Sequence, residues 1–350
     1  MKIYRIDPIQ DPRWEAFLQA HPDASVFHTP AWLTALSSTY GYEPLVFTTS
    51  PPLHLITNGL LLCRVQSWLT GSRLVSVPFA DHCQLLFGHS EDDRRLAASL
   101  PSLVETEHCD YLEVRSPIPE VLQPTQGWLA PSADFLHHTF DLTPSLPALF
   151  DRFHKSCFQR KIRRAEKEGL TYTEGASDTL LQQFYSLFAL TRRRHGMPPQ
   201  PLSWFRNLRN AFGNAIKIGV VLKNDRPIAS MLTLRHKTTV VYKYGCSDAT
   251  FHRFGAMPYL FWQTIQHAKS NSATELDLGR SDMDAVGLIA FKNHLGAVTT
   301  PLTYYRYPAS SASPGAFTRL MQNRKVSAVS AHLPSVLLKA AGSFLYRHTG

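Results

Sequence analysis

Two spacings of apolar residues alternate along the chain, one typical of strands and one typical of helices. The opening run, KIYRI, favours a strand. Asp11-Pro12 and Thr29-Pro30 each resemble a helix N-cap followed by proline in the first helical position, and Gly41 favours a helix stop. Around the two helices that these caps predict, we expect strands in EPLVFTT, LITNGLLLCRV, LVSVPF and YLEVRS, and a further helix over 92–106.

The second half begins with a basic helix, expected over 149–168, and a second helix, expected over 178–195. Cations, Gly196 and two prolines end that second helix. The elements that follow are the strands AIKIGVVLK, RPIASMLTLRH and TTVVYKYGC, a helix over 258–270, the strand TELDLG, a short helix in GLIAFKNHLG and the strand LTYYRYP. This order predicts an α+β (mixed α/β) fold around one sheet.

Six prolines between residues 117 and 147 mark the expected crossover between two domains. We place the first domain at 1–134, the second at 135–308, and a linker with a helical tail at 309–350. The tail is basic and amphipathic, with cations at Arg319, Arg324, Lys325, Lys339 and Arg347. Its apolar residues Leu333, Leu337, Phe344 and Leu345 are expected to pack on the second domain or to contact a membrane surface peripherally.

The composition is that of a globular protein. The 350 residues are 44% hydrophobic and 18% charged, which excludes a disordered or collagen-like chain. The five cysteines form no CxxC pair and show no zinc spacing, so we expect a reducing compartment. Met1 leads into KIYRIDPIQD without an apolar segment, so no signal peptide is expected. Together these features predict a cytoplasmic protein.

The net charge of +9 is unevenly distributed. Residues 1–150 carry a net charge of −8, residues 151–284 carry +10, and residues 285–350 contain seven Lys or Arg and no acidic residue. The C-terminal part is therefore suited to hold a polyanion, such as a phosphorylated cofactor, a tRNA or a lipid headgroup. The alternative is that the acidic and basic halves attract each other.

Several catalytic motifs are missing from the sequence: GxSxG, the Walker A loop, HExxH and GxGxxG. His137 and His138 are adjacent, but alternation along a strand would send them to opposite faces. No metal site is therefore expected. The candidate chemistry lies in four other groups of residues.

The first two groups are cationic. Arg160, Arg164 and Lys167 fall on one face of the basic helix, where they can hold phosphates or form a solvated face. Arg194 and His195 close the next helix and are candidate substrate-binding residues. Cations also stabilise a helix C-terminus without any ligand, which is the alternative for this second group.

The third group lies at residues 242–262, where a strand and a turn lead into a helix. Arg253, Gly255 and Ala256 stand at the N-terminus of that helix, whose free N–H groups suit a pyrophosphate. Tyr244 is a candidate substrate-binding residue, with core packing as its alternative.

The fourth group, DLGRSDMDAVGLIAFKNHLG at 277–296, begins at the end of a strand, where open sheets form ligand crevices. Arg280 and Asp282 would lie in that crevice. Lys292 stands beside Phe291 within an apolar helix, and a lone helical lysine usually faces solvent.

Seven stretches carry a resemblance to a known family: HTPAW with the following YG (28–41), RLVSVPFADHCQLLF (73–87), YLEVRS (111–116), RKIRRAEKEGL (160–170), LTRRRHGMPPQP (190–201), YKYGCSD (242–248) and DLGRSDMDAVGLIAFKNHLG (277–296). With them the chain resembles the FemAB-like branch of the GNAT acyltransferase superfamily, which includes BioF2-like acetyltransferase domains. More narrowly, it resembles FemAB-like proteins of exopolysaccharide and exosortase systems.

This resemblance implies two tandem GNAT-like domains and transfer of an acyl or aminoacyl group to an amine. A lysine in an FK..FG pattern stabilises the reacting centre in classical members, and Lys292 stands in that pattern here, with Leu295 in place of the second Phe. The R/Q-x-x-G-x-G/A loop of acyl-CoA enzymes is poorly matched by residues 253–258, and the coiled-coil arm of some classical members has no counterpart.

The sequence therefore predicts an N-acyltransferase that modifies an amine of a cell-envelope or exopolysaccharide precursor, small or lipid-linked. Lys292 would stabilise the oxyanion, and Asp277, or Asp282 through water, would accept the amine proton. Arg160, Arg164 and Arg280 would hold donor phosphates. The donor is expected to be acyl-CoA, with acetyl-CoA as the first candidate, or aminoacyl-tRNA. The alternatives are aminoacyl-tRNA-dependent transfer of the peptidoglycan type and a non-catalytic protein that binds polyanions.

Overall fold

The computed structural model describes residues 2–88, 90–116, 129–308 and 334–349. By their internal contacts these residues divide into two compact units. The first comprises the described residues of Met1–Phe135, Leu302–Gln322 and Phe344–Gly350, and the second those of Leu136–Pro301 and Asn323–Ser343. The domain ranges 1–134, 135–308 and 309–350 stay a proposal, because the later segments of the chain return to the first unit.

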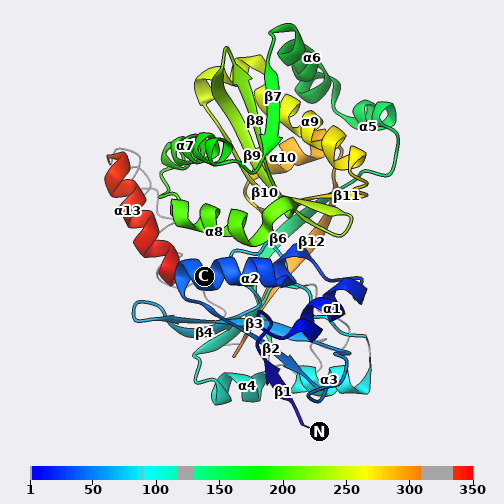
Figure 1. Ribbon diagram of the computed structural model, residues 1–350, viewed down its shortest axis with the longest axis vertical. Coiled ribbons are helices and arrows are strands. Elements are labelled where there is room, and N and C mark those ends of the chain that lie inside the picture. Colours follow the sequence, from blue (N-terminus) through cyan, green and yellow to red (C-terminus); the bar gives the residue numbers. More distant parts are fainter. Residues whose placement is uncertain (1, 89, 117–128, 309–333, 350) are drawn as a thin grey trace. The chain divides into compact units, whose positions relative to one another are not determined.

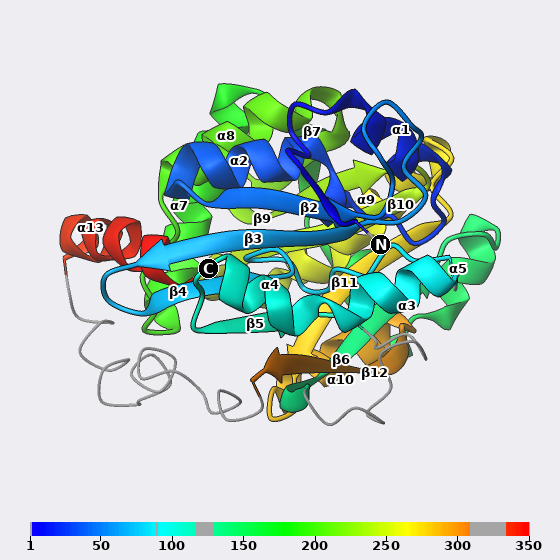
Figure 2. The same cartoon turned by 90° about the horizontal axis from the view of Figure 1, so that it is seen from below.

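The first unit is a mixed sheet with helices in its connections (Figures 1 and 2). Its elements are β1 (Tyr4–Ile6), α1 (Pro12–Ala20), η1 (Val26–His28), α2 (Pro30–Tyr40), β2 (Glu43–Thr48), β3 (Leu60–Ser67), β4 (Gly71–Val75), α3 (Glu91–Ala98), α4 (Leu100–Thr106), β5 (Tyr111–Val114) and the end of β12 (Val298–Tyr307). The strand order is β1-β2-β3-β4-β5-β12, and only β4 and β5 are parallel to each other.

The second unit has the same plan. Its elements are β6 (Ala130–Asp141), α5 (Leu146–Arg152), the π-turn η4 (Lys155–Gln159), α6 (Arg160–Lys167), β7 (Thr171–Gly175), α7 (Asp178–Arg194), α8 (Leu202–Phe212), η5 (Gly213–Ala215), β8 (Ile216–Lys223), β9 (Arg226–His236), β10 (Thr239–Ser247), η6 (Ala249–Phe254), α9 (Ala256–Ser270), β11 (Glu275–Asp282) and α10 (Val286–Leu295). The strand order is β6-β11-β10-β9-β8-β7.

The two units repeat one connectivity. In each, four strands pair antiparallel in sequence, helices follow the first strand, and helical segments lead from the fourth strand to a parallel fifth. The α+β fold class and the two tandem GNAT-like domains that the sequence predicted are confirmed.

The predicted caps explain where the helices begin. The side chains of Asp11 and Thr29 accept hydrogen bonds from the first-turn N–H groups of α1 and α2. Gly41 ends α2 in the left-handed conformation, with φ of 74°. Most strands also lie where the apolar pattern placed them.

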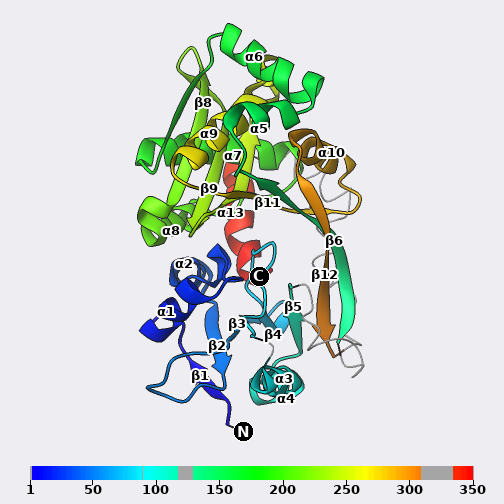
Figure 3. The same ribbon diagram turned by 90° about the vertical axis from the view of Figure 1, so that its right-hand side faces the viewer.

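Helices cover both faces of the second sheet. Helix α9 packs on β8 and β9 and shares an apolar core with α5, α6 and α10, whereas α7 packs on the same strands from the other face. Figure 3 shows α10 beside the end of β11. No helix within the described residues is long and apolar enough to cross a membrane.

Two predicted helices are wrong in detail, and two elements were missed. The basic helix expected over 149–168 is broken into α5, η4 and α6, because the chain is extended at Phe153 and restarts with the His154 side chain as N-cap. The helix over 92–106 is two helices that meet at Ser99. Strand β7 and helix α8 were not predicted from the pattern.

The tail prediction is corrected only in its first alternative, packing on the protein, and the alternative of a membrane contact stays a prediction. Helix α13 (Ser335–Leu345) and η8 (Tyr346–His348) are present, but Leu337 is 56% exposed and Phe344 50% exposed, so neither is buried. Leu338 is buried instead, at 3%. Arg319, Arg324, Lys325 and Leu333 lie outside the described residues.

Candidate active site in the second unit

The parallel strands β10 and β11 pair only over their first halves. Their register runs from Thr239–Glu275 to Val241–Asp277 and then stops, although β10 continues to Ser247 and β11 to Asp282. Peptide groups beyond Asp277 are therefore not used between these two strands. Such groups can bind a substrate that enters between them.

Local backbone features separate the two strands. The register of β10 with β9 shifts between Tyr242 and Tyr244, as in a β-bulge. As a result the two rings serve opposite faces: Tyr242 contacts Phe261 of α9, and Tyr244 contacts Phe205 of α8. In β11, Gly279 has φ of 67°, a conformation that glycine adopts readily.

Lys292 is anchored at the separated part of β11. Its side chain reaches back from α10, and Nζ donates to the carbonyl oxygens of Gly279 at 3.0 Å and Arg280 at 2.9 Å. The residue is only 3% exposed, so it is not the solvent-facing lysine that is usual on a helix. A buried ammonium that faces carbonyl dipoles is a preorganised positive charge.

Asp277, the last residue of β11 that pairs with β10, is also buried, at 3% exposure. Its Oδ1 accepts from the Gly279 N–H at 2.7 Å and lies 2.9 Å from His137 Nε2. Sequence reasoning missed His137, because a single histidine on a strand gives no signal until the neighbouring strand is known. The His137–Asp277 pair provides a histidine whose orientation is fixed by a carboxylate.

His138 belongs to a separate hydrogen-bonded row. Thr299 Oγ1 donates to Asn293 Oδ1 at 3.2 Å and lies 3.0 Å from His138 Nδ1, which therefore donates to the hydroxyl. Nε2 is buried with no partner among the described residues. Burial and the charge of Lys292 lower the pKa of His138 to about 4, which keeps the ring neutral at pH 7.

Asp282 and Arg280 lie where β11 ends. Asp282 is exposed, and its carbonyl oxygen accepts from the Ala285 N–H in the turn before α10. Arg280 is half-buried and contributes its carbonyl oxygen to Lys292. Ser281 between them has a buried hydroxyl without a partner among the described residues. Four predicted site residues of 277–296 thus lie on β11 and α10, and Lys292 joins the two elements.

The basic helix keeps its cationic row on α6. All three side chains of this row, Arg160, Arg164 and Lys167, are exposed. Arg164 Nε lies 3.9 Å from Glu168 Oε1. Arg163 points elsewhere and lies over the Phe150 ring. The row is available to an anionic ligand.

Arg194, His195 and Tyr244 gather around the end of α7. Arg194 Nη1 donates to the Ser247 carbonyl oxygen at 3.1 Å. Burial and the neighbouring arginines lower the pKa of His195. Tyr244 OH accepts from Trp204 Nε1 at 2.9 Å, and its ring packs against Phe188 of α7. These residues share the face that α7 and α8 cover.

The turn before α9 is closely packed. A Cβ at Gly255, where φ is 76°, would lie 2.5 Å from the carbonyl oxygen of Lys161. Ala256 is buried and Arg253 is exposed over the Phe254 ring. Pro258, in the first turn of α9, offers no N–H group.

This combination of a separated parallel strand pair and tandem topology agrees with the sequence comparisons. Residues 152–292 match the acetyltransferase (GNAT) domain family. They form a GNAT acyltransferase domain. The GNAT domain contains Lys292 at its last matched residue and includes every other predicted site residue. The predicted resemblance and the acyltransferase class are confirmed.

Known relatives are similar to much of the chain. A UDP-N-acetylmuramoylpentapeptide-lysine N(6)-alanyltransferase of Weissella viridescens is 24% identical over 195 residues, which cover 54% of this chain and 56% of that protein. The match thus spans little more than half the length of this curated relative. A crystal structure of FemX has a TM-score of 0.67 at 15% identity and covers 92% of this chain and all of the other.

Two further solved structures share the fold. L-PGS from Bacillus licheniformis has a TM-score of 0.58 at 13% identity, with 92% of this chain and 98% of the other covered. A tandem GNAT protein from the clavulanic acid biosynthesis pathway has a TM-score of 0.52 at 11% identity, with 88% and 99% covered. At these identities the likeness establishes the fold alone.

Among the described residues of the second unit, three side chains have the chemistry of metal ligands. The candidate ligand atoms of His154, Cys157 and His294 lie within 4.8 Å of one another. His154 Nδ1, however, already accepts the Cys157 backbone N–H at 3.2 Å. This arrangement caps η4, and we assign no metal to it.

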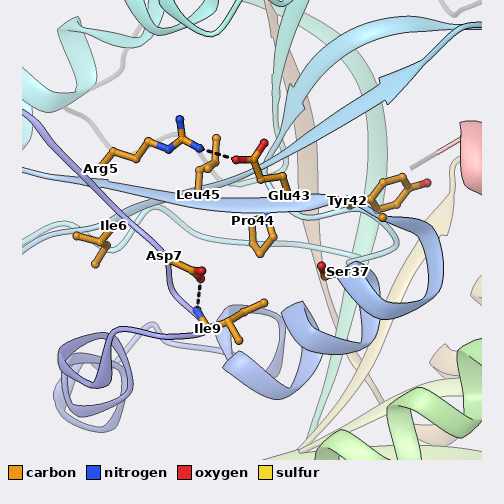
Figure 4. A pocket seen from close by; sticks show the side chains of 10 residues that line it. Arg5, Ile6, Asp7, Ile9, Ser37, Tyr42, Glu43, Pro44 and Leu45 are labelled. Carbon is orange, nitrogen blue, oxygen red and sulfur yellow. Dashed lines mark hydrogen bonds and ion pairs between the residues drawn. The ribbon is translucent and has the colours of Figure 1, made fainter.

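A pocket in the first unit contains none of the predicted site residues (Figure 4). It has a volume of about 450 Å³, and Arg5, Asp7, Tyr42 and Glu43 are among its lining residues. Arg5 is paired with Glu43, and Asp7 accepts the Ile9 N–H. Its charged groups are therefore engaged locally, and the chemistry is better sought at β10 and β11.

Proposed function

We propose that this protein transfers an aminoacyl group from aminoacyl-tRNA to a primary amine of a peptidoglycan-type precursor. The observation that carries the proposal is the buried Lys292 ammonium, fixed at the separated end of β11. The similarity to an alanyltransferase that acts on a lysine amine supports the choice of reaction.

The reaction needs a neutral amine. Its nitrogen attacks the ester carbonyl carbon, a C–N bond forms, and the carbonyl oxygen becomes an oxyanion. Collapse of this intermediate breaks the C–O ester bond and releases the terminal ribose oxygen of the tRNA. The proton lost by the amine ends on that leaving oxygen, so no external oxidant or base is consumed.

Lys292 is suited to stabilise the oxyanion. Two of its N–H donors are held by the carbonyl oxygens of Gly279 and Arg280, which fix the ammonium without neutralising it. A positive charge in a dry site acts most strongly where negative charge develops, and here that is the carbonyl oxygen in the transition state. Its effect therefore falls on turnover more than on substrate binding.

The His137–Asp277 pair can accept the proton that the amine loses. Asp277 is buried and already accepts the Gly279 N–H, so it acts through His137 rather than by direct contact with the amine. Asp282, exposed at the end of the same strand, is the second candidate and would act through water. In either case a group near the separated strands takes the proton before the leaving oxygen does.

The turn before α9 supports tRNA over coenzyme A as the donor. A pyrophosphate at that helix would need its first-turn N–H groups and a site without competing oxygens. Here Pro258 removes one N–H, and the Lys161 carbonyl oxygen abuts Gly255. The exposed row Arg160, Arg164 and Lys167 offers phosphate contacts of the kind an RNA backbone makes.

The test separates donor from acceptor. The purified protein is incubated with alanyl-tRNA or acetyl-CoA, and with UDP-N-acetylmuramoyl-pentapeptide or an amino-sugar nucleotide as acceptor. We expect product only from alanyl-tRNA and the pentapeptide, and thermal protection by the charged tRNA. Transfer from acetyl-CoA to an amino sugar would replace this proposal by the acyl-CoA reaction of an exopolysaccharide precursor. Protection by tRNA without transfer to either acceptor would favour the polyanion-binding alternative.

A further inference from the structure

The turn between β3 and β4 presents large apolar side chains to solvent. Trp68 is 80% exposed and Leu69 is 46% exposed. Tight turns between strands are normally built from small or polar residues. An exposed tryptophan at such a turn contributes little apolar burial to the stability of the first unit. Exposed apolar side chains that are close together often mark a surface that binds another molecule.

This turn is held rigidly. Ser67 Oγ accepts the Leu69 and Thr70 N–H groups at 3.1 and 2.9 Å and lies 2.9 Å from His348 Nδ1. The His348 carbonyl oxygen accepts from Thr70 Oγ1 at 2.8 Å and from Arg73 Nη2 at 2.9 Å. Trp68 is therefore displayed by a fixed turn that the C-terminal segment ties down.

The same C-terminal segment adds a third apolar side chain. Phe344 is 50% exposed, and its ring centroid lies 6.3 Å from that of Trp68 and 4.9 Å from that of His348. The β3–β4 turn and the end of α13 lie side by side in Figure 2. Trp68, Leu69 and Phe344, which we call the turn patch, thus form one exposed apolar cluster.

Positive charge accompanies the turn patch. Arg347 is exposed, and it lies one residue before the His348 that fixes the turn. Over residues 309–350 the sequence has five Lys or Arg and no Asp or Glu. Exposed apolar side chains beside a cation are complementary to a surface of apolar chains under anionic headgroups.

We infer that the turn patch docks the protein on an anionic lipid bilayer. The Trp68 ring would occupy the interface, where amphipathic aromatic rings are favoured, and Leu69 and Phe344 would reach the acyl boundary. Arg347 would remain at the headgroups. This contact is peripheral and independent of the proposed aminoacyl transfer, but it would place the enzyme where lipid-linked amine acceptors reside.

The test uses the full chain and two kinds of vesicle, phosphatidylcholine alone and phosphatidylcholine mixed with phosphatidylglycerol. We expect co-sedimentation with the anionic vesicles, weakened by salt, and a blue shift of tryptophan emission on binding. Trp68→Ser with Phe344→Ser should lower the partition coefficient about tenfold or more, because two apolar side chains no longer enter the interface. Arg347→Gln should lower it roughly fivefold.

Two variants serve as controls. Leu190→Ser changes a residue that is 44% exposed on α7 and should bind like the wild type. Trp68→Phe should bind nearly as well as the wild type but lose most of the blue shift. Equal binding by wild type and the double serine variant, or binding to neither vesicle, would overturn the inference. No transfer assay enters this experiment, so failure of the proposed function leaves its result intact.

Discussion

The parallel strand pairs of the two units differ in what happens at their ends. In the first unit, β4 and β5 pair to Val75–Glu113, and Ser76 continues the contact by donating its N–H to the Glu113 carbonyl oxygen at 2.8 Å. In the second unit, β10 and β11 stop pairing at Val241–Asp277. We call the first unit, where β4 and β5 stay together, the closed copy. The second unit, where β10 and β11 separate after Asp277, is the open copy.

The charged groups beside these strands differ in the same way. Glu113 is buried between Arg115 Nε at 2.8 Å and Arg306 Nη2 at 2.7 Å, so its charge is satisfied within the first unit. Lys292 in the second unit instead donates to two neutral carbonyl oxygens, those of Gly279 and Arg280. We therefore propose that the first copy contributes mainly to stability and the second to the chemistry, and single variants can separate the two roles.

Breaking the closed copy should have the largest effect on stability. Burial alone would raise the pKa of Glu113, but Arg115 and Arg306 hold it below its usual value. Glu113→Gln leaves two guanidiniums without their anion and should lower the free energy of unfolding by about 3–5 kcal/mol. Turnover per folded molecule should not change. A loss of turnover with unchanged denaturant stability would contradict the division of roles.

Gly255→Ala tests the close contact between the turn before α9 and the Lys161 carbonyl oxygen, and it should lower the free energy of unfolding. The left-handed conformation alone should cost about 1–2 kcal/mol for alanine. The clash with the Lys161 carbonyl oxygen should add to this. Gly41→Ala is the matched control, since φ is 74° there and no atom lies within 4 Å of the new Cβ. Equal destabilisation of the two variants in chemical denaturation would show that the Lys161 contact is unimportant.

Removing the cationic row should change binding rather than folding. Arg160→Ala with Arg164→Ala should weaken tRNA binding most at low salt, where screening is least. If each arginine contacts one phosphate, the slope of log affinity against log salt should fall by roughly 1.4–1.8. Arg163→Ala on the same helix should leave the slope unchanged, because Arg163 lies over Phe150. Equal slopes for the wild type, the double variant and Arg163→Ala would show that this row faces solvent and does not bind tRNA.

Lowering the pH should slightly reduce the folding stability of the second unit, because His138 is held neutral there. Its pKa is about 4 in the fold against 6.5 for an ordinary histidine, so the unfolded chain binds the proton more readily. His138 therefore contributes stability above pH 6.5, and this is lost as the pH falls from 6.5 toward 4. His138→Asn keeps a donor for Thr299 and should show a smaller drop in melting temperature between pH 7 and pH 5, measured by calorimetry. An equal drop would remove His138 as the cause.

Local signals in the sequence predict much of the fold. The N-caps Asp11 and Thr29 and the stop at Gly41 are short-range patterns, and the structure confirms all three. Helix α8 also carries a helical pattern, with Trp204 and Leu208 buried on one face, but no element was predicted between the end of the helix over 178–195 and the strand AIKIGVVLK. The basic helix was predicted as one piece because its apolar spacing does not reveal the break at Phe153.

The candidate site depends on contacts between distant segments. Lys292 resembles a solvent-facing lysine in its helix, and only the position of β11 shows that it is buried. The separation of β10 from β11 depends on a bulge and on Gly279, neither of which the apolar pattern marks. His137 acquires a role only when β6 brings it to Asp277. Sequence could therefore nominate the segment 277–296 but not its geometry.

The most direct test of the open copy compares two lysines that make the same kind of contact. Lys292 Nζ donates to the carbonyl oxygens of Gly279 and Arg280, and Lys269 Nζ donates to those of Leu142 and Thr143 at 2.8 and 3.1 Å. Single-turnover transfer is measured for Lys292→Met and Lys269→Met after both are shown to fold and to bind charged tRNA. We predict a loss of about 10²–10³ in rate for Lys292→Met and a rate close to wild type for Lys269→Met. Near wild-type turnover in Lys292→Met would contradict the account.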